Sequence, residues 1–313
     1  MGLVQSLVIK AQRQLLDGIG RAVGTKVVYL KAAWADPVLY GGTGQRAGSD
    51  LDVLVRPAAF FAFARALEGE GFRRYVQPWL RATFRLGYKA WTFEGQPRWM
   101  TVDLHRAIAE APWFELDPDA CVDRATVYDS VDGPILSLCP EDQVLYAAAH
   151  YGQHRFTIDH RHLDDVERLL AGRAVAWPVV LERARPAGLS VPLRLLMESL
   201  RARGAGVPSA PEAALLRWRL GYAHRWVATA PALERRLPPS RIVDNVLRMP
   251  LLSGRPAALP RFVASYLSLR ALDVVAEVYH RALDADAALR PGPPDRAGRD
   301  GERDPGQRAG GAG

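Results

Sequence analysis

Two aspartates one residue apart, Asp50 and Asp52, begin the apolar run DLDVLV. In an extended strand alternate side chains share a face, so both carboxylates would point the same way, about 7 Å apart. Two carboxylates on one partly buried face repel each other unless a positive group lies between them. Hard divalent cations such as Mg²⁺ prefer oxygen ligands, so the pair predicts a metal site for phosphoryl chemistry. The alternative is a turn cap formed by Ser49 and Asp50.

A later run, TVDLH at residues 101–105, supplies a third carboxylate. Asp103 and His105 would share one strand face with Thr101, while the valine and leucine between them face the core. Two strands would then bring three carboxylates together, which is the ligand supply that a two-metal site needs. In this interpretation His105 orients Asp103 or caps the strand rather than binding metal.

The elements that must position these side chains follow an alternating α/β pattern in the first part of the chain. The predicted elements are a helix at 3–22, a strand at 27–31, a short helix with Pro37 in or near its first turn and Gly41–Gly42 at its end, a strand at 50–55, a helix from Pro57 to Gly71, and strands at 72–78, 82–93 and 98–107.

From Pro140 onward the pattern becomes helical, with glycine and proline separating the segments. The last residues, RPGPPDRAGRDGERDPGQRAGGAG, contain almost no apolar side chains and cannot form a core. The sequence therefore predicts an α/β domain at 1–138, an all-α domain at 139–290 and a disordered tail at 291–313.

Composition limits the class of protein. The chain of 313 residues has no stretch of 18 apolar residues, so no membrane contact is expected. Its N-terminus lacks the basic and apolar regions of a signal peptide. Two cysteines without a CxxC motif argue against disulfides or a zinc–cysteine site and predict a cytoplasmic protein.

Basic charge is concentrated in the second half of the chain. Residues 1–150 contain 16 lysines and arginines against 17 acidic residues, whereas residues 151–313 contain 25 against 17. Such an excess can attract an anionic partner such as RNA. The arginines are scattered and few aromatic residues lie among them, which favours a role in solubility.

Several motifs together resemble a known family. VVYLKAAWADPVLYGGTGQRAGSDLDVLV resembles the signature of polymerase-β-type nucleotidyltransferases, in particular a bacterial family of uncharacterised nucleotidyltransferases. The matching positions, in order over residues 26–170, are Leu30–Lys31, Arg46, Asp50-Leu51-Asp52, Val102-Asp103-Leu104-His105, His150, His154 and Asp164.

The resemblance implies a nucleotidyltransferase domain with a small mixed sheet, followed by helices. It implies Mg²⁺, with Mn²⁺ as a substitute, bound by Asp50, Asp52 and Asp103. Lys31, Arg46 and Ser49 would bind a nucleoside triphosphate, while His105, His150, His154 and Asp164 would contact an acceptor or support the metal ligands. The acceptor is left open between a small molecule, a peptide product and an RNA end.

Single residues keep simpler alternatives. Lys31 could be a surface lysine at a strand end, and Arg46 could simply pair with Asp50. His150 and His154 are four residues apart on one helix face, but no glutamate follows the first as in HExxH, which argues against a zinc hydrolase. They could instead be packing histidines held by Asp159 or Asp164.

One position departs from the family pattern. Ala32–Ala33 stands where the family has a glycine that lets the backbone approach the phosphates. This departure supports an alternative function, in which the chain is a catalytically degenerate binding or regulatory module with a nucleotidyltransferase fold.

Overall fold

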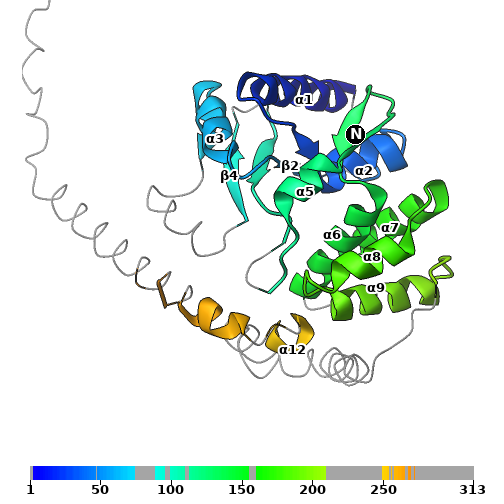
Figure 1. The fold of residues 1–313 in the computed structure, drawn as a ribbon. Coiled ribbons are helices and arrows are strands. Elements are labelled where there is room, and N and C mark those ends of the chain that lie inside the picture. Colours follow the sequence, from blue (N-terminus) through cyan, green and yellow to red (C-terminus); the bar gives the residue numbers. More distant parts are fainter. Residues whose placement is uncertain are drawn as a thin grey trace, which may run out of the picture. The chain divides into compact units, whose positions relative to one another are not determined.

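The protein is described by a computed structural model, drawn as a ribbon in Figure 1. The described residues are 3–46, 48–74, 89–95, 99–109, 113–154, 160–208, 249–253, 255, 257–264, 267, 268 and 271. Residues Met1–Leu267 form one compact unit by their contacts, and a second unit from Ser268 contributes two of the described residues.

Within the described residues, seven strands form one mixed sheet in the order β3-β4-β5-β2-β1-β7-β6. The strands are β1 (Val28–Tyr29), β2 (Asp50–Leu54), β3 (Arg73–Arg74), β4 (Ala90–Glu94), β5 (Thr101–His105), β6 (Thr126–Tyr128) and β7 (Ile135–Ser137). The pairs β2–β5 and β1–β7 are parallel, and the other neighbours are antiparallel. The predicted α/β class with a mixed sheet is therefore confirmed.

The register of β2 on β5 sets the position of the acidic residues. Asp52 lies opposite Asp103, so these two side chains are direct neighbours on one face of the sheet. Val53 and Leu104 are fully buried on the other face. This confirms the predicted alternation of acidic and apolar side chains in β2 and β5. A shift of one residue in the register would have put the aspartates on the apolar face.

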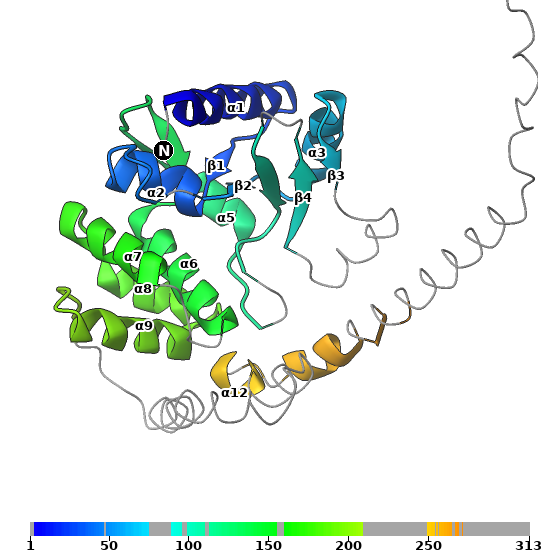
Figure 2. The same cartoon turned by 180° about the vertical axis from the view of Figure 1, so that it is seen from behind.

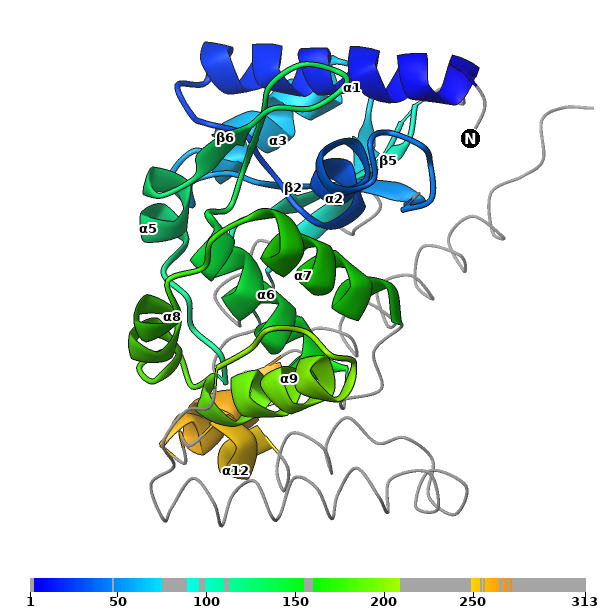
Figure 3. The ribbon, with the colours of Figure 1, turned by 90° about the vertical axis from the view of Figure 1, so that its right-hand side faces the viewer.

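Helices cover both faces of the sheet. Figure 3 shows α1 (Leu3–Ala22) and α3 (Phe60–Gly69) on one side and α6 (Pro140–Gln153) and α7 (His160–Gly172) on the other. Aromatic packing joins α3 to β4, since the rings of Phe60 and Trp91 have centroids 5.1 Å apart. Figure 2 shows α2 (Lys31–Leu39) beside β1 and β2. The acidic face of β2 and β5 therefore lies on the side of α6.

Some local predictions were wrong or incomplete. The strand predicted at 27–31 is only β1, because Lys31 already begins α2. Pro37 lies well inside α2 rather than in its first turn. The predicted end of this helix at Gly41–Gly42 is confirmed, because the helix stops at Leu39 and both glycines follow with positive φ. The short elements β6, β7 and α5 (Pro118–Asp123) have no counterpart in the sequence prediction.

The second half of the described chain is helical, as predicted. After α6 and α7 come α8 (Trp177–Ala184), α9 (Ser190–Ala202) and α12 (Met249–Ser253). The division at residue 138 stays a prediction. Parts of the strands predicted at 72–78 and 82–93, and the whole tail at 291–313, lie outside the described residues. Among the described residues no helix combines the length and apolar character needed to cross a membrane.

A buried carboxylate joins three of these elements. Asp142, in the first turn of α6, has no exposed surface and accepts hydrogen bonds from Arg124 at 2.9 Å and Arg183 at 3.0 Å. Arg124 follows α5 and Arg183 lies in α8. Two arginines and the positive end of α6 together compensate the burial of this charge.

We expect Asp142→Ala to lower the free energy of unfolding by about 2 kcal/mol, because two arginines, each about one-third exposed, lose their shared partner. Urea unfolding followed by circular dichroism measures the change. Asp119→Asn is the matched control: its 3.3 Å pair with Arg56 is exposed, so the substitution should leave the free energy of unfolding nearly unchanged. Equal losses in both variants would contradict the assignment.

Candidate active site

The acidic face of the sheet carries a compact group of potential metal ligands. Asp52, Asp103 and His105 each offer a ligand atom, and these atoms lie within 4.8 Å of one another. Asp52 is 1% exposed, and Asp103 is half-buried. Asp50, two residues earlier on β2, shares the face with Asp52 but does not belong to this group.

Two basic side chains meet at Asp52. Lys31 Nζ donates to Asp52 Oδ1 at 2.5 Å, and His105 Nε2 lies 2.9 Å from the same oxygen. The sequence predicted a positive group beside the carboxylates. At Asp52 the chain itself supplies this group, through Lys31 and His105. Lys31 is a specific partner of Asp52 rather than a surface lysine, and His105 contacts Asp52 rather than Asp103.

Lys31 reaches Asp52 from an unusual backbone conformation. Its φ of 45° lies in the left-handed region, where it is alone among the described residues other than glycine. A lysine there costs about 1–2 kcal/mol relative to an ordinary helical residue. The bond to a buried carboxylate offsets that cost.

The two aspartates of β2 have opposite ionisation behaviour. Burial alone would raise the pKa of Asp52, but the hydrogen bond from His105 and the charge of Lys31 lower it to about 2. Partial burial, and then the negative charge of Asp52, raise the pKa of Asp50 above its ordinary value. Asp52 is therefore ionised under all ordinary conditions. The ionised form of Asp50 is destabilised by its surroundings, and a bound cation would stabilise it.

The remaining carboxylate and the serine of the DxD segment have local partners. Asp103 accepts a hydrogen bond from the hydroxyl of Thr92 on β4 at 2.6 Å. Ser49 is exposed and its hydroxyl lies 3.4 Å from Asp50 Oδ1. This weak contact is the turn-cap alternative, and it leaves the Asp50 carboxylate open to other partners.

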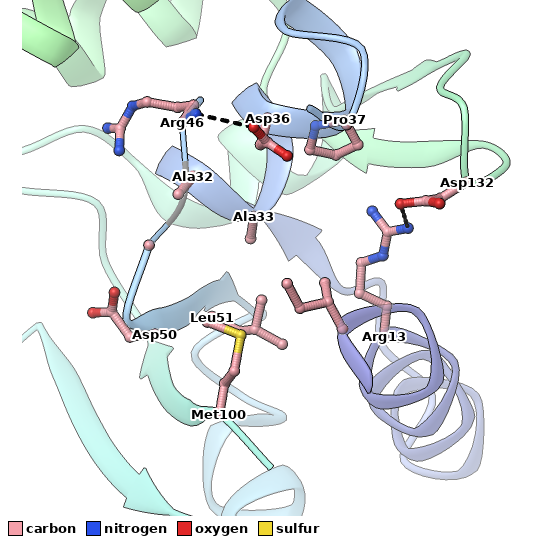
Figure 4. Close-up of a pocket in the computed structure, with 13 residues that line it drawn as sticks. Arg13, Ala32, Ala33, Asp36, Pro37, Arg46, Asp50, Leu51, Met100 and Asp132 are labelled. Carbon is pink, nitrogen blue, oxygen red and sulfur yellow. Dashed lines mark hydrogen bonds and ion pairs between the residues drawn. The ribbon is translucent and has the colours of Figure 1, made fainter. Parts of the chain in front are cut away.

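Arg46 was expected either to bind the triphosphate or to pair with Asp50, but it is buried in an ion pair with another residue. Its Nε donates to both oxygens of Asp165 on α7, at 2.9 and 2.8 Å, and it does not pair with Asp50. Tyr40 also donates to Asp165, at 3.0 Å. The backbone N–H of Arg46 donates to Asp36 Oδ1 at 3.0 Å (Figure 4). Arg46 therefore fixes the loop before β2 against α7.

Asp164 does not lie where the resemblance placed it. Its carboxylate forms an ion pair with Arg203, which follows α9, and is 40% exposed. The acidic residue on the inner side of α7 is Asp165. The other acidic alternative for holding the histidines, Asp159, lies outside the described residues.

His150 and His154 belong to a cluster of three histidines. The ring centroids of His150 lie 4.2 Å from His154 and 4.3 Å from His162 on α7. Burial, and then the charges that His162 and His154 would carry, lower the pKa of His150 to about 2, so its ring is neutral. The donor atoms of the three rings do not form a metal-binding group among the described residues.

Sequence reasoning missed four residues near this site: Trp34, Tyr146, His162 and Asp165. A usable signal existed for α7, because His162, Asp165, Val166 and Leu169 follow the i, i+3, i+4, i+7 spacing of an inward-facing stripe. Asp164 is off that stripe. Tyr146 lies one turn before His150 on α6, so the same reasoning places both on one face.

The start of α2 separates two pockets. The first, shown in Figure 4, lies between α2, β2 and α1 and is lined by Ala32, Ala33, Asp50 and Leu51 among others. The second lies between α2, α6 and α7 and has Lys31 in its lining. The first pocket thus borders Asp50, and the second borders Lys31, the partner of Asp52.

The alanine that departs from the family pattern has a complementary glycine. A Cβ built on Gly48 would lie 2.9 Å from the Cβ of Ala32, closer than real Cβ contacts. Ala32 is nearly buried at the same place. The methyl group of Ala32 thus fills space that only a glycine at position 48 leaves open.

A family model described as "Uncharacterised nucleotidyltransferase" matches residues 5–203. The solution structure of the antibiotic-resistance factor ANT(2'')-Ia aligns over 63% of this chain and 92% of its own, with 10% identity and a TM-score of 0.37. An antigenic nucleotidyltransferase-like protein from Paracoccidioides brasiliensis aligns over 63% and 88%, with 12% identity and a TM-score of 0.39. No curated protein gave a significant match.

The pairing of Asp52 predicts a pH-dependent contribution to stability. Because its pKa falls from 3.8 to about 2 on folding, the ionised form stabilises the protein by about 2 kcal/mol at pH 7. This contribution is complete above pH 4 and is lost as the pH falls through 2. We expect Asp52→Asn to be less stable at pH 7, with the difference shrinking between pH 4 and 3.

Urea unfolding in EDTA at each pH measures this difference. Asp50→Asn is the control of opposite sign, because the raised pKa of Asp50 means that its charge opposes folding. It should not lower stability at pH 7. A neutral effect of Asp52→Asn at pH 7 would contradict the proposed role of Lys31 and His105.

A second prediction concerns Ala32 and Gly48. Gly48→Ala should lower the free energy of unfolding by about 1–3 kcal/mol, because the two Cβ atoms would collide. In an Ala32→Gly background the same substitution should cost less. A double-mutant cycle from urea unfolding measures the coupling, and strictly additive effects would show that the two residues do not interact.

Proposed function

This chain belongs to the uncharacterised nucleotidyltransferase family, and we propose that it moves a nucleoside monophosphate from a nucleoside triphosphate to an acceptor in a reaction that depends on Mg²⁺. The observation that carries the proposal is the pairing of Asp52 with Asp103 across two parallel strands. It gathers the acidic residues on the face beside α2, where pockets border both Asp50 and Lys31.

The ligand set fits a divalent cation. Asp52, Asp103 and His105 present ligand atoms within 4.8 Å, and Asp50 adds a carboxylate whose hydrogen bond from Ser49 is long, at 3.4 Å. Carboxylate oxygens suit Mg²⁺, and a nearby imidazole nitrogen is also acceptable to Mn²⁺. We propose that Asp50, Asp52 and Asp103 hold the ions and that His105 orients Asp52. Bound divalent ions would neutralise phosphate charge and favour the alkoxide form of the acceptor.

The chain's own residues have separate tasks in this reaction. The acceptor oxygen attacks the α-phosphorus, the bond from that phosphorus to the bridging oxygen breaks, and pyrophosphate leaves. Asp103 receives the proton of the acceptor hydroxyl. Lys31, at the edge of the carboxylate group, would pair with the triphosphate.

Two residues of the loop before β2 act in different ways. Ser49, exposed beside Asp50, would donate its hydroxyl hydrogen to a phosphate oxygen. Arg46 acts as a positioning residue, because its guanidinium is buried against Asp165 and holds the loop that precedes Asp50. This assignment replaces the direct phosphate contact that the resemblance implied for Arg46.

Three classes of acceptor fit an oxygen nucleophile: a small molecule, a peptide product and an RNA end. The experiment therefore has to find the acceptor as well as the activity. Purified protein is incubated with each α-labelled nucleoside triphosphate, Mg²⁺ or Mn²⁺ and a host-cell extract that has been separated into small molecules, protein and RNA. The labelled fraction identifies the class.

We expect label transfer by the wild type and a loss of about 10³-fold or more in Asp52→Ala, because a carboxylate that would hold the divalent ions is removed. Ala32→Gly should leave the rate unchanged or raise it. Asp119→Asn, an exposed aspartate on α5, should transfer normally. EDTA should abolish transfer in every variant.

Two results would contradict the proposal. Transfer that persists in Asp52→Ala would place the chemistry elsewhere. No transfer by the wild type into any fraction, with partner binding unchanged in Asp52→Ala, would favour the degenerate binding module instead.

A further inference from the structure

The pocket between α2, α6 and α7 has walls of a particular kind. Trp34 and Tyr146 line it together with His150 and His162. Aliphatic surface comes from Ala147, Val166 and Leu169, and the rest of the lining is polar or charged, from Lys31, Gln143 and Asp165. Flat rings and small apolar side chains form a site that suits a planar ligand.

Within this lining, the polar atoms Trp34 Nε1, Tyr146 Oη and His150 Nδ1 are buried without a partner among the described residues. Trp34 is 3% exposed and Tyr146 is 5% exposed, so water has little access to either side chain. A buried polar group without a partner is costly, and a cluster of them in one pocket is an unusual concentration. A ligand that offers hydrogen-bonding atoms at several positions would satisfy the cluster.

The two charged side chains of this lining, Lys31 and Asp165, already have partners of opposite charge. Lys31, which lines one end, is already paired with Asp52. Asp165 in the wall is held by Arg46, and the ring of His150 is neutral. The hydroxyl of Tyr146 is protonated, since burial and then the negative charges of the three site carboxylates raise its pKa well above the ordinary value. The free donors therefore call for a neutral ligand with acceptor atoms.

Position relates the pocket to the proposed reaction. Lys31 borders the pocket and also contacts Asp52, so a ligand held here lies directly beside the carboxylate group. Tyr146 is close enough to those carboxylates for their negative charges to raise the pKa of its hydroxyl. A bound molecule would have one end in the aromatic pocket and the other beside the carboxylates.

We propose that this pocket binds the base of the nucleoside triphosphate, a neutral planar heterocycle whose carbonyl or ring-nitrogen acceptors take hydrogen bonds from Trp34 and Tyr146. The inference rests on the proposed function for its choice of nucleotide. A purine or pyrimidine is flat enough for the ring-lined walls and carries acceptors along its edge.

The experiment separates the base from the phosphates. Adenosine, guanosine, cytidine and uridine are titrated into the full-length protein in EDTA, with ribose as the sugar-only control, and binding is followed by ligand-detected NMR. Tripolyphosphate with Mg²⁺ is titrated separately by calorimetry. The variants are Trp34→Phe and Tyr146→Phe, which keep the rings and remove only the unpartnered polar atoms.

We expect at least one nucleoside to bind the wild type while ribose does not. Each variant should bind that nucleoside about 3- to 10-fold more weakly, the change expected for one lost hydrogen bond. Neither variant should change the affinity for Mg²⁺–tripolyphosphate, which Asp52→Asn should weaken. Because the removed atoms have no partner in the free protein, neither variant should lower the midpoint of urea unfolding.

Tyr151→Phe is the matched control on the same helix. Its hydroxyl lies 2.9 Å from the hydroxyl of Ser199 and it does not line the pocket, so nucleoside binding should be unchanged. The proposal is overturned if no nucleoside binds, or if Trp34→Phe and Tyr146→Phe bind nucleosides like the wild type. A loss of stability in both variants would mean that these atoms have a structural partner, such as buried water, and would also overturn it. Loss of Mg²⁺–tripolyphosphate binding in Asp52→Asn tests the proposed function independently of these outcomes.

Discussion

A single buried carboxylate organises the active-site region. Asp52 is nearly inaccessible, and an ionised aspartate in such a place is tolerated only with opposite charge and hydrogen bonds around it. Lys31 from the start of α2 and His105 from the end of β5 supply both at the same oxygen atom. Three chain segments, each remote in sequence from the others, must therefore meet at one point for the charge to be compensated.

A second buried ion pair extends this arrangement into the helical half. Arg46 lies in the loop that leads to β2, and Asp165 lies on α7, 119 residues later. Tyr40 shares the same carboxylate, so the loop is held at two points. His150 of α6 and His162 of α7 line the same pocket as Asp165. The acidic strands and the helices that follow the predicted boundary at residue 138 thus contribute to one common site.

The sequence was most informative in the strands, where side chains alternate every two residues between the two faces of the sheet. Alternation in DLDVLV and TVDLH predicted which side chains share a face, and the register of Asp52 on Asp103 confirmed it. The family resemblance, predicted from motifs within residues 26–170, was confirmed by the family model that matches residues 5–203. Helical spacing could also have chosen Asp165 over Asp164, since only Asp165 falls on the apolar stripe of α7.

Other features were beyond local reasoning. The partner of Arg46 depends on a contact between distant segments, which no spacing along the chain encodes. The strands β6 and β7 have three residues each, too few for a period-2 pattern to stand out. The end of β1 was misjudged because Lys31, the last residue of VVYLK, adopts a left-handed backbone conformation that a lysine side chain does not predict.

That backbone conformation places Lys31 under two conflicting demands. Glycine is the residue that adopts a positive φ without strain, so local geometry alone would select glycine here. The buried charge of Asp52, however, requires a long cationic side chain at this point, which glycine lacks. A substitution can satisfy the backbone or the carboxylate but not both. The start of α2 is therefore a locally frustrated position, where the lowest-energy residue for folding and the residue needed by the acidic cluster are different amino acids.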